Sequence, residues 1–235
     1  MALPQLNTPS YEMEVPSTGE TVKYRPFLVK EQKVLMIAQE TGKEGDMARA
    51  MCDIIKSCTD GKIPNPQKLP TFDIEYMFLQ LRAKSAGAEV ELQITCPDDG
   101  ETKVPVKINL EEVKVQRDDA HSTDIMITED IGVKMKYPSM MDISKYSAGK
   151  TKAVDLTFGI IKDCVESVFD AEQVYEDMPK KELDEFLESM NTEQFGKIQT
   201  FFDTMPKVKH TIKVTNPNTE VESEVIVEGM QNFLG

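Results

Sequence analysis

Apolar and polar residues alternate in four short stretches of the chain, and each stretch predicts a β-hairpin. A period of two residues indicates a strand with one buried face, and Pro, Gly and Asn at the centre of each stretch mark the turn. The expected hairpins cover residues 11–25 (turn at 16–19), 90–108 (turn at 96–100), 125–137 (turn at 129–132) and 211–227 (turn at 216–218).

Between these stretches, apolar residues three and four positions apart predict amphipathic helices. The clearest stripe consists of Met47, Ala50, Met51, Ile54, Ile55 and Cys58, on a helix that begins near Asp46. Further helices are expected at residues 29–40, at 71–87, along the stripe 154–168, after Pro179, and after Asn191, whose side chain forms a capping pair with Gln194. Hairpins interspersed with helices predict the α+β class.

The order hairpin, helix, helix, hairpin occurs twice, which indicates an internal pseudo-repeat. Four short segments match in the same order in both halves: 22–25 with 133–136, 54–58 with 160–164, the apolar helix 74–81 with 195–202, and 95–98 with 215–218. We therefore expect two similar lobes, residues 1–118 and 119–235, each with helices packed on small antiparallel hairpins. The polar segment 116–123 would join them.

Net charge narrows the range of partners. The chain has 27 Lys and Arg against 41 Asp and Glu, a net charge of −14, so its average surface repels phosphate and we expect no nucleic-acid partner. No run of about 18 apolar residues is present, so we expect no membrane insertion. Four cysteines are too few for a disulfide scaffold and suit a reducing compartment.

Acidic residues are concentrated between residues 163 and 193. This segment is a candidate surface for a basic partner, and Asp184, Glu185 and Glu188 are the residues that would face that partner. The other interpretation is a solvated helical face that binds nothing, and the sequence leaves both open.

Motifs for catalysis or for a bound metal or cofactor are incomplete. Residues 147–151 end like a phosphate-binding loop, but Ser144 stands where its first glycine belongs. Cys96-Pro-Asp-Asp-Gly100 has the form of a zinc-knuckle turn with Asp99 at the position of the second thiolate. We therefore expect no catalytic residue, no metal, no cofactor and no small-molecule substrate.

Two segments carry a resemblance to a known family. Residues 24–36 (YRPFLVKEQKVLM) and 69–85 (LPTFDIEYMFLQLRAKS), together with GVKMKYP at 132–138, resemble the baseplate proteins of T-even-like contractile-tailed phages, in the group named for baseplate hub subunit or hub assembly function. Members of this family often have a Cys-Pro-x-Cys-Gly turn after the Arg-Ala-Lys-Ser segment. This chain keeps only Cys96, Pro97 and Gly100, which argues against a metal role.

The resemblance implies a structural or assembly protein that acts by protein–protein binding without catalysis. Its partners would be hub, tube-initiation or tape-measure components, met in the host cytoplasm during assembly, and a subunit that stays would be part of the virion tail baseplate. The matched segment adds Phe72, Glu75, Tyr76 and Arg82 to the candidate interaction residues. The alternative is an enzyme of unrecognised type with its site between the two lobes.

Overall fold

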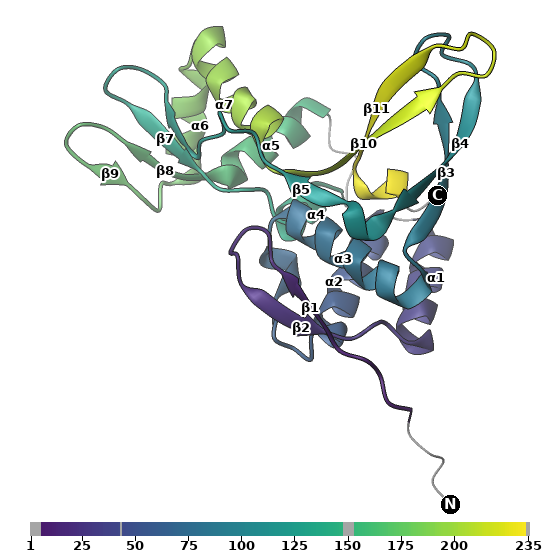
Figure 1. Cartoon of the computed structure of the whole chain (residues 1–235). Coiled ribbons are helices and arrows are strands. Elements are labelled where there is room, and N and C mark those ends of the chain that lie inside the picture. Colours follow the sequence, from purple (N-terminus) through teal and green to yellow (C-terminus); the bar gives the residue numbers. More distant parts are fainter. Residues whose placement is uncertain (1–5, 43, 148–152, 234–235) are drawn as a thin grey trace, which may run out of the picture. The chain divides into compact units, whose positions relative to one another are not determined.

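The computed structural model describes residues 6–42, 44–147 and 153–233, and its chain divides into two compact units (Figure 1). Unit 1 combines Met1–Gln116 with Lys207–Gly235, and unit 2 is Arg117–Pro206. The first boundary lies close to the one expected near residue 118. The last hairpin, however, belongs to unit 1 and not to the second half of the chain, so the division differs from the expected lobes 1–118 and 119–235.

The described residues of unit 1 include three long helices, and the third has the most buried side chains. These helices are α1 (Val29–Thr41), α2 (Glu44–Cys58) and α3 (Thr71–Ala86). The stripe predicted for α2 is buried from Ala50 to Cys58. Helix α3 is buried on most of its surface, including the polar Asp73 and Gln80. Ser17 satisfies the Asp73 carboxylate through its amide, at 2.9 Å, and its hydroxyl. Such pairing is what allows a charged side chain to be buried in a helix core.

The strands of unit 1 form one three-stranded and two two-stranded antiparallel sheets. The two-stranded sheets pair β1 (Tyr11–Glu14) with β2 (Thr21–Tyr24), and β3 (Glu89–Thr95) with β4 (Lys103–Asn109). The third sheet has the order β11 (Glu222–Glu228), β10 (Lys207–Thr215), β5 (Lys114–Gln116). Short 3-10 turns lie at Pro66–Lys68, Leu110–Glu112 and Met230–Phe233. The expected hairpins at 11–25, 90–108 and 211–227 are thus confirmed.

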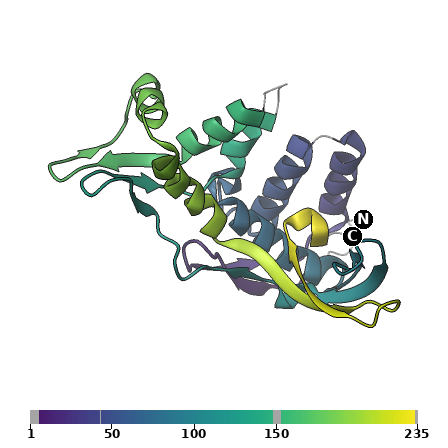
Figure 2. The ribbon, with the colours of Figure 1, turned by 90° about the horizontal axis from the view of Figure 1, so that it is seen from above.

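Strand β10 explains why the last hairpin belongs to unit 1. Its first residues pair with β5, with Val208 opposite Val115, and Val208 is fully buried. Figure 2 shows the β10–β11 hairpin running beside the β3–β4 hairpin. A sequence repeat does not specify this long-range pairing, because the hydrogen bonds join segments about ninety residues apart.

Unit 2 is built on a four-stranded antiparallel sheet of order β6-β7-β8-β9 with helices packed against it. The strands are β6 (Asp124–Met126), β7 (Gly132–Met135), β8 (Val165–Phe169) and β9 (Val174–Tyr175). The helices are α4 (Met140–Ser147), α5 (Ala153–Cys164), α6 (Lys180–Glu188) and α7 (Thr192–Thr204). The predicted capping pair is present, since Asn191 and Gln194 exchange hydrogen bonds of 3.0 and 2.9 Å.

One predicted helix is shorter than its apolar stripe. The stripe 154–168 suggested a continuous helix, but α5 ends at Cys164, and Val165 and Val168 lie in strand β8. In β8 the residues pair with β7 on one side and β9 on the other. A central strand buried on one face also presents apolar residues at short intervals, so spacing alone did not distinguish the two structures.

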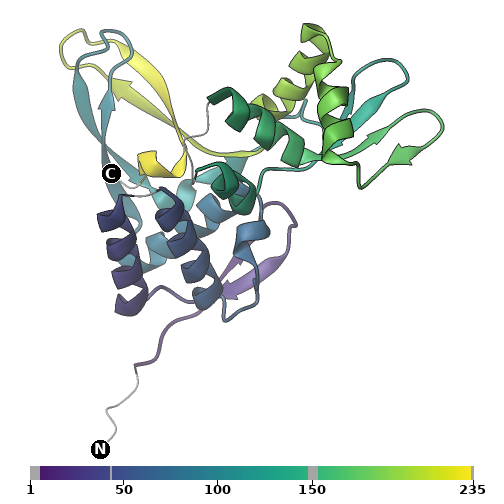
Figure 3. The ribbon, with the colours of Figure 1, turned by 180° about the vertical axis from the view of Figure 1, so that it is seen from behind.

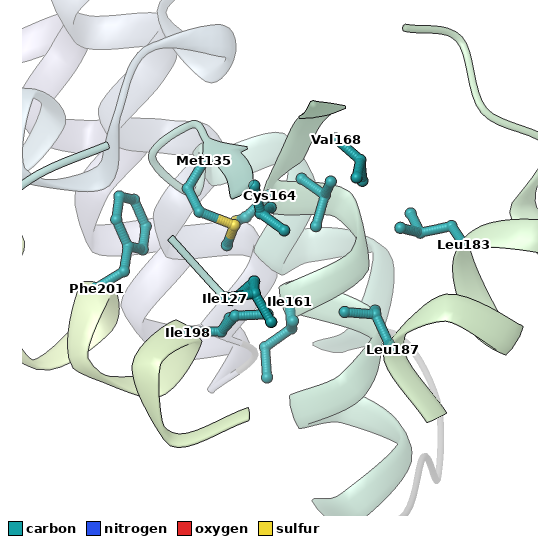
Figure 4. Close-up of a cluster of buried hydrophobic side chains, with 11 residues drawn as sticks. Ile127, Met135, Ile161, Cys164, Val168, Leu183, Leu187, Ile198 and Phe201 are labelled. Atoms are coloured by element: carbon teal, nitrogen blue, oxygen red, sulfur yellow. The ribbon is translucent and has the colours of Figure 1, made fainter. Parts of the chain in front are cut away.

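Apolar side chains from the sheet and three helices meet in the core of unit 2 (Figure 4). Ile161 of α5, Leu187 of α6 and Ile198 of α7 are each at most 3% exposed. They pack with Ile127, Val133, Met135, Cys164, Val165, Val168, Leu183 and Phe201. The α+β class is confirmed, and no helix among the described residues is long and apolar enough to cross a membrane.

Candidate interaction surfaces

Helix α6 carries the acidic residues that the sequence singled out. Leu183 and Leu187 anchor it in the unit 2 core, because they are the residues of the helix that are buried. With this face fixed inward, Glu182, Glu185 and Glu188 are exposed, while Asp184 is partly covered. The helix therefore holds three carboxylates in solvent on a rigid support.

Lysines neutralise part of the acidic segment 163–193. Three carboxylates pair with lysines that precede the segment: Asp184 with Lys162 at 2.6 Å, Asp163 with Lys145 at 3.0 Å, and Glu166 with Lys134 at 3.3 Å. Glu185 lies 3.5 Å from Lys181 of its own helix. The charge that remains for a partner is therefore smaller than the sequence suggests.

An open cleft of roughly 400 Å³ lies at the base of α6, within unit 2. Its lining has both signs of charge, from Lys136, Lys162, Lys180, Asp163, Glu166, Asp177 and Asp184. Tyr146 donates a 3.1 Å hydrogen bond to Asp163, and burial followed by the Asp163 charge raises the pKa of this phenol. The lining therefore presents both cationic donors and carboxylate acceptors to solvent.

The four candidates on α3 differ in accessibility. Phe72 is 2% exposed and packs inside unit 1, so its ring is not accessible to a partner while α3 keeps this packing. Glu75, Tyr76 and Arg82 are partly exposed. Burial lowers the pKa of Arg82, and its guanidinium forms no hydrogen bond or ion pair with any residue that the structure describes. Burial, followed by the charge of Glu14, raises the pKa of Tyr76.

Glu75 has the most perturbed carboxylic acid of the candidates. Burial and then the nearby Glu228 carboxylate raise its pKa to about 7, although a hydrogen bond from the Met230 amide acts in the opposite direction. A carboxylic acid with this pKa is partly protonated near neutral pH. It can then donate a hydrogen bond as well as accept one.

Helix α1 has an exposed apolar face that was not predicted from the sequence. Val29, Met36 and Ile37 are 80%, 55% and 51% exposed, and they lie on the side of the helix opposite the buried Glu31 and Ala38. Figure 3 shows α1 beside α2 at the surface of unit 1. The signal was present, since the apolar residues of 29–41 do not follow one stripe that a core would bury. Exposed apolar surface that is contiguous is a candidate for a binding site.

Two lysines border this apolar face. Lys30 and Lys33 are exposed on the first turns of α1, and the acidic Glu31 between them points inward to Arg25. The exposed charge at the start of α1 is therefore positive, in contrast to the chain as a whole. We call Val29, Lys30, Lys33, Met36 and Ile37 the α1 face.

The remaining candidates are possible metal and nucleophile sites. The described part of the chain contains no group of three or more His, Cys, Asp and Glu side chains placed to hold a metal ion. All four cysteines are free and buried, and burial raises the thiol pKa of Cys52 and Cys58 to about 11 and of Cys164 to about 12. Most of the loop 147–151 lies outside the described residues.

Comparison with known proteins gives one family. The model of the family described as T4 bacteriophage base plate protein matches residues 8–235. Neither the comparison with curated proteins nor the comparison with solved structures yields a match.

Proposed function

Because this chain belongs to the T4 bacteriophage base plate protein family, we propose that it is a structural or assembly component of the baseplate hub. The family match, which extends over nearly the whole chain, carries this proposal and supports a phage baseplate role. We further propose that the protein acts by binding other tail proteins, without catalysis, and that the hub, tube-initiation or tape-measure components are its partners.

The α1 face supports a first contact. Its exposed apolar side chains lie beside Lys30 and Lys33, so its partner would present an apolar ridge flanked by acidic residues. Burial of such side chains contributes roughly 25 cal/mol per Å² of apolar surface, which makes this face the stronger source of affinity.

The acidic face of α6 supports a second contact, of opposite chemistry. Glu182, Glu185 and Glu188 would face a basic surface, and exposed charges of this kind act mainly on the rate of association. One unit thus offers an apolar and basic face and the other an acidic one. Two faces of different chemistry fit a protein that joins two different neighbours.

Assembly would take place in the host cytoplasm, where the partners are made. Mass spectrometry of purified virions, compared with that of assembly intermediates, separates the two roles within this proposal. A subunit is present in both samples, whereas an assembly factor is present in the intermediates alone.

Coexpression with each hub, tube-initiation and tape-measure component tests the proposal directly. We expect a stable complex with at least one of them, weakened tenfold or more by Val29→Ser, Met36→Gln and Ile37→Gln together. The control variant changes exposed apolar residues elsewhere, Val174→Thr, Val221→Thr and Ile226→Thr, and should bind like the wild type. Absence of any complex, or catalytic turnover of a substrate by the isolated protein, would contradict the proposed function.

A further inference from the structure

Two hairpin turns of unit 1, from the β3–β4 and β10–β11 hairpins, share the hydrogen-bond pattern of their first five residues. They close differently, because the amide of Cys96 donates to the Thr102 carbonyl and that of Asn216 to the Val221 carbonyl, so the first turn is one residue longer. The first begins at Cys96 and the second at Asn216, and a proline follows each. The amide of Gly100 donates to the Cys96 carbonyl at 2.9 Å, and the amide of Glu220 donates to the Asn216 carbonyl at 2.9 Å. In both turns the fifth residue is left-handed, Gly100 at φ 69° and Glu220 at φ 59°.

The positive φ of Glu220 is informative because non-glycine residues rarely adopt it. Here the second turn keeps the conformation of the first without the glycine that favours it. The turn Val15–Gly19 of the β1–β2 hairpin has the same hydrogen bond and a left-handed Gly19, so the contact between their side chains is what distinguishes the other two turns.

Side chains of the two turns bind each other directly. The Asn216 amide nitrogen Nδ2 donates to Asp98 Oδ1 at 3.1 Å and to Asp99 Oδ2 at 2.8 Å. Thr219 donates to Asp98, and Asn218 Nδ2 donates to Thr102 at 2.9 Å. The contacts join residues more than one hundred positions apart in the chain.

Burial makes the contact structurally specific. Asn216 is fully buried, and so is Cys96 at the same position of the other turn. The Asn216 side chain satisfies both of its ends, because its Oδ1 accepts from the Asn218 amide at 2.9 Å while its Nδ2 binds the carboxylates. A buried amide with complete hydrogen bonding fixes one arrangement of its neighbours.

Two adjacent carboxylates stay ionised in this arrangement. Hydrogen bonds from Thr219 and then Asn216 lower the pKa of Asp98. Hydrogen bonds from Thr102 and nearby amides, with Asn216 in addition, lower that of Asp99. Neutral donors of the second turn therefore compensate negative charge on the first.

By their order within the two turns, four residues stand at the ligand positions of a zinc site made from two knuckles. Each knuckle supplies ligands at its first and fourth positions, and two such turns complete the tetrahedral shell of the ion. In this chain those positions are Cys96 and Asp99 in one turn and Asn216 and Thr219 in the other. Only the first of the four is a thiol.

We propose that the two turns are a metal-free counterpart of a two-knuckle zinc site. The hydrogen bonds of Asn216 and Thr219 to Asp98 and Asp99 hold the two turns together, as a bound zinc ion would. This hydrogen-bonded clasp holds the tips of the β3–β4 and β10–β11 hairpins together. It makes one stiff element from two hairpins that contribute no strand to a common sheet.

Introducing thiols at the other three positions tests whether the two turns can hold a zinc ion. The variant Asp99→Cys, Asn216→Cys and Thr219→Cys supplies three thiols in addition to Cys96. We expect it to retain one equivalent of zinc after dialysis, and its Co²⁺ form to show the absorption of tetrahedral thiolate coordination. The wild type, and a matched variant with Ser at the same three positions, should retain none. A folded triple-Cys variant without bound zinc would overturn the proposal.

If the triple-Cys protein does not fold, hydrogen exchange on a second variant tests whether the hydrogen bonds hold the two turns together. Asn216→Ala should speed amide exchange about tenfold in both turns, 96–102 and 216–221, because it removes charge-assisted hydrogen bonds that join them. Lys107→Ala, an exposed change on the same hairpin, should leave both turns as they are. Faster exchange confined to 216–221 would mean that the turns are independent and would refute the clasp.

Discussion

The Arg25 guanidinium donates to the Glu31 carboxylate across 2.9 Å, and this pair ties the end of the first hairpin to the start of helix α1. Glu31 has a side chain only 6% exposed. It also accepts from the Leu28 amide and from the Ser57 hydroxyl, each at 2.9 Å. One carboxylate thus joins three segments of unit 1.

Glu31→Ala should lower the free energy of unfolding by about 3 kcal/mol, because it leaves a largely buried guanidinium without its partner. Chemical denaturation at pH 7 measures this value. Lys30→Ala is the control, since Lys30 contacts the same carboxylate from solvent at 3.4 Å and its loss should cost less than about 1 kcal/mol. Equal losses in the two variants would contradict the central role of the buried pair.

Glu31 also predicts a pH dependence in acid. Burial raises the pKa of this carboxyl, but hydrogen bonds from Arg25, Leu28 and Ser57 outweigh it and set the pKa at about 2. Its folded-state pKa lies below the unfolded value of 4.5, so the stabilisation is complete above pH 4.5 and is lost as the pH falls toward 2. Between pH 5 and 2, the free energy of unfolding, measured by chemical denaturation at each pH, should change less with pH for Glu31→Ala than for the wild type.

Glu75 should have the opposite effect. Its pKa of about 7 lies above the unfolded value of 4.5, so the stability that it contributes is present in acid and is lost as the pH rises through about 7. Glu75→Gln should therefore stabilise the protein by about 1 to 2 kcal/mol at pH 8 and change little at pH 4. Denaturation at the two pH values tests this, and a Gln variant that is less stable at pH 8 would show that Glu75 is needed as a carboxylate.

Two helical glycines should respond to alanine with opposite signs. Alanine normally stabilises an interior helix position by about 1 kcal/mol relative to glycine. At Gly196 of α7 a new Cβ meets nothing within 4 Å, so Gly196→Ala should raise the melting temperature. At Gly159 of α5 a Cβ would clash with the ring of Tyr146, whose hydroxyl donates to Asp163. Gly159→Ala should lower it, and stabilisation by both variants would contradict this packing.

The acidic face of α6 should affect binding through its charge alone. Glu182→Gln, Glu185→Gln and Glu188→Gln together leave Leu183 and Leu187 in the core and spare Asp184, which pairs with Lys162. We expect thermal stability to change little, while association with a baseplate partner becomes slower, most clearly at low ionic strength. Stopped-flow or surface-binding kinetics at several salt concentrations measure this effect.

A matched variant separates local charge from net charge. Glu20→Gln, Glu91→Gln and Glu101→Gln change three exposed carboxylates of unit 1 and alter the total charge by the same amount. Association rates should stay close to those of the wild type. If both triple variants associate at wild-type rates, the α6 face is a solvated surface and the partner binds elsewhere.

The sequence by itself determined most of the local elements of this protein, but its patterns did not predict helix α4 or strands β5, β8 and β9. Hairpins at 11–25, 90–108, 125–137 and 211–227 follow from alternation and turn residues, and the predicted helices follow from apolar spacing, with a capping pair at the start of α7. These signals act between residues a few positions apart. They are readable without knowing what the rest of the chain does.

Only the tertiary structure decided where each element is used. Strand β10 pairs with β5 and takes the last hairpin into unit 1, Val165 joins a central strand, and the apolar residues of α1 remain exposed. Asn216 and Asp99 illustrate the reason. Each fits its own turn, but the hydrogen bond between them depends on the packing of two distant hairpins, which neither local pattern specifies.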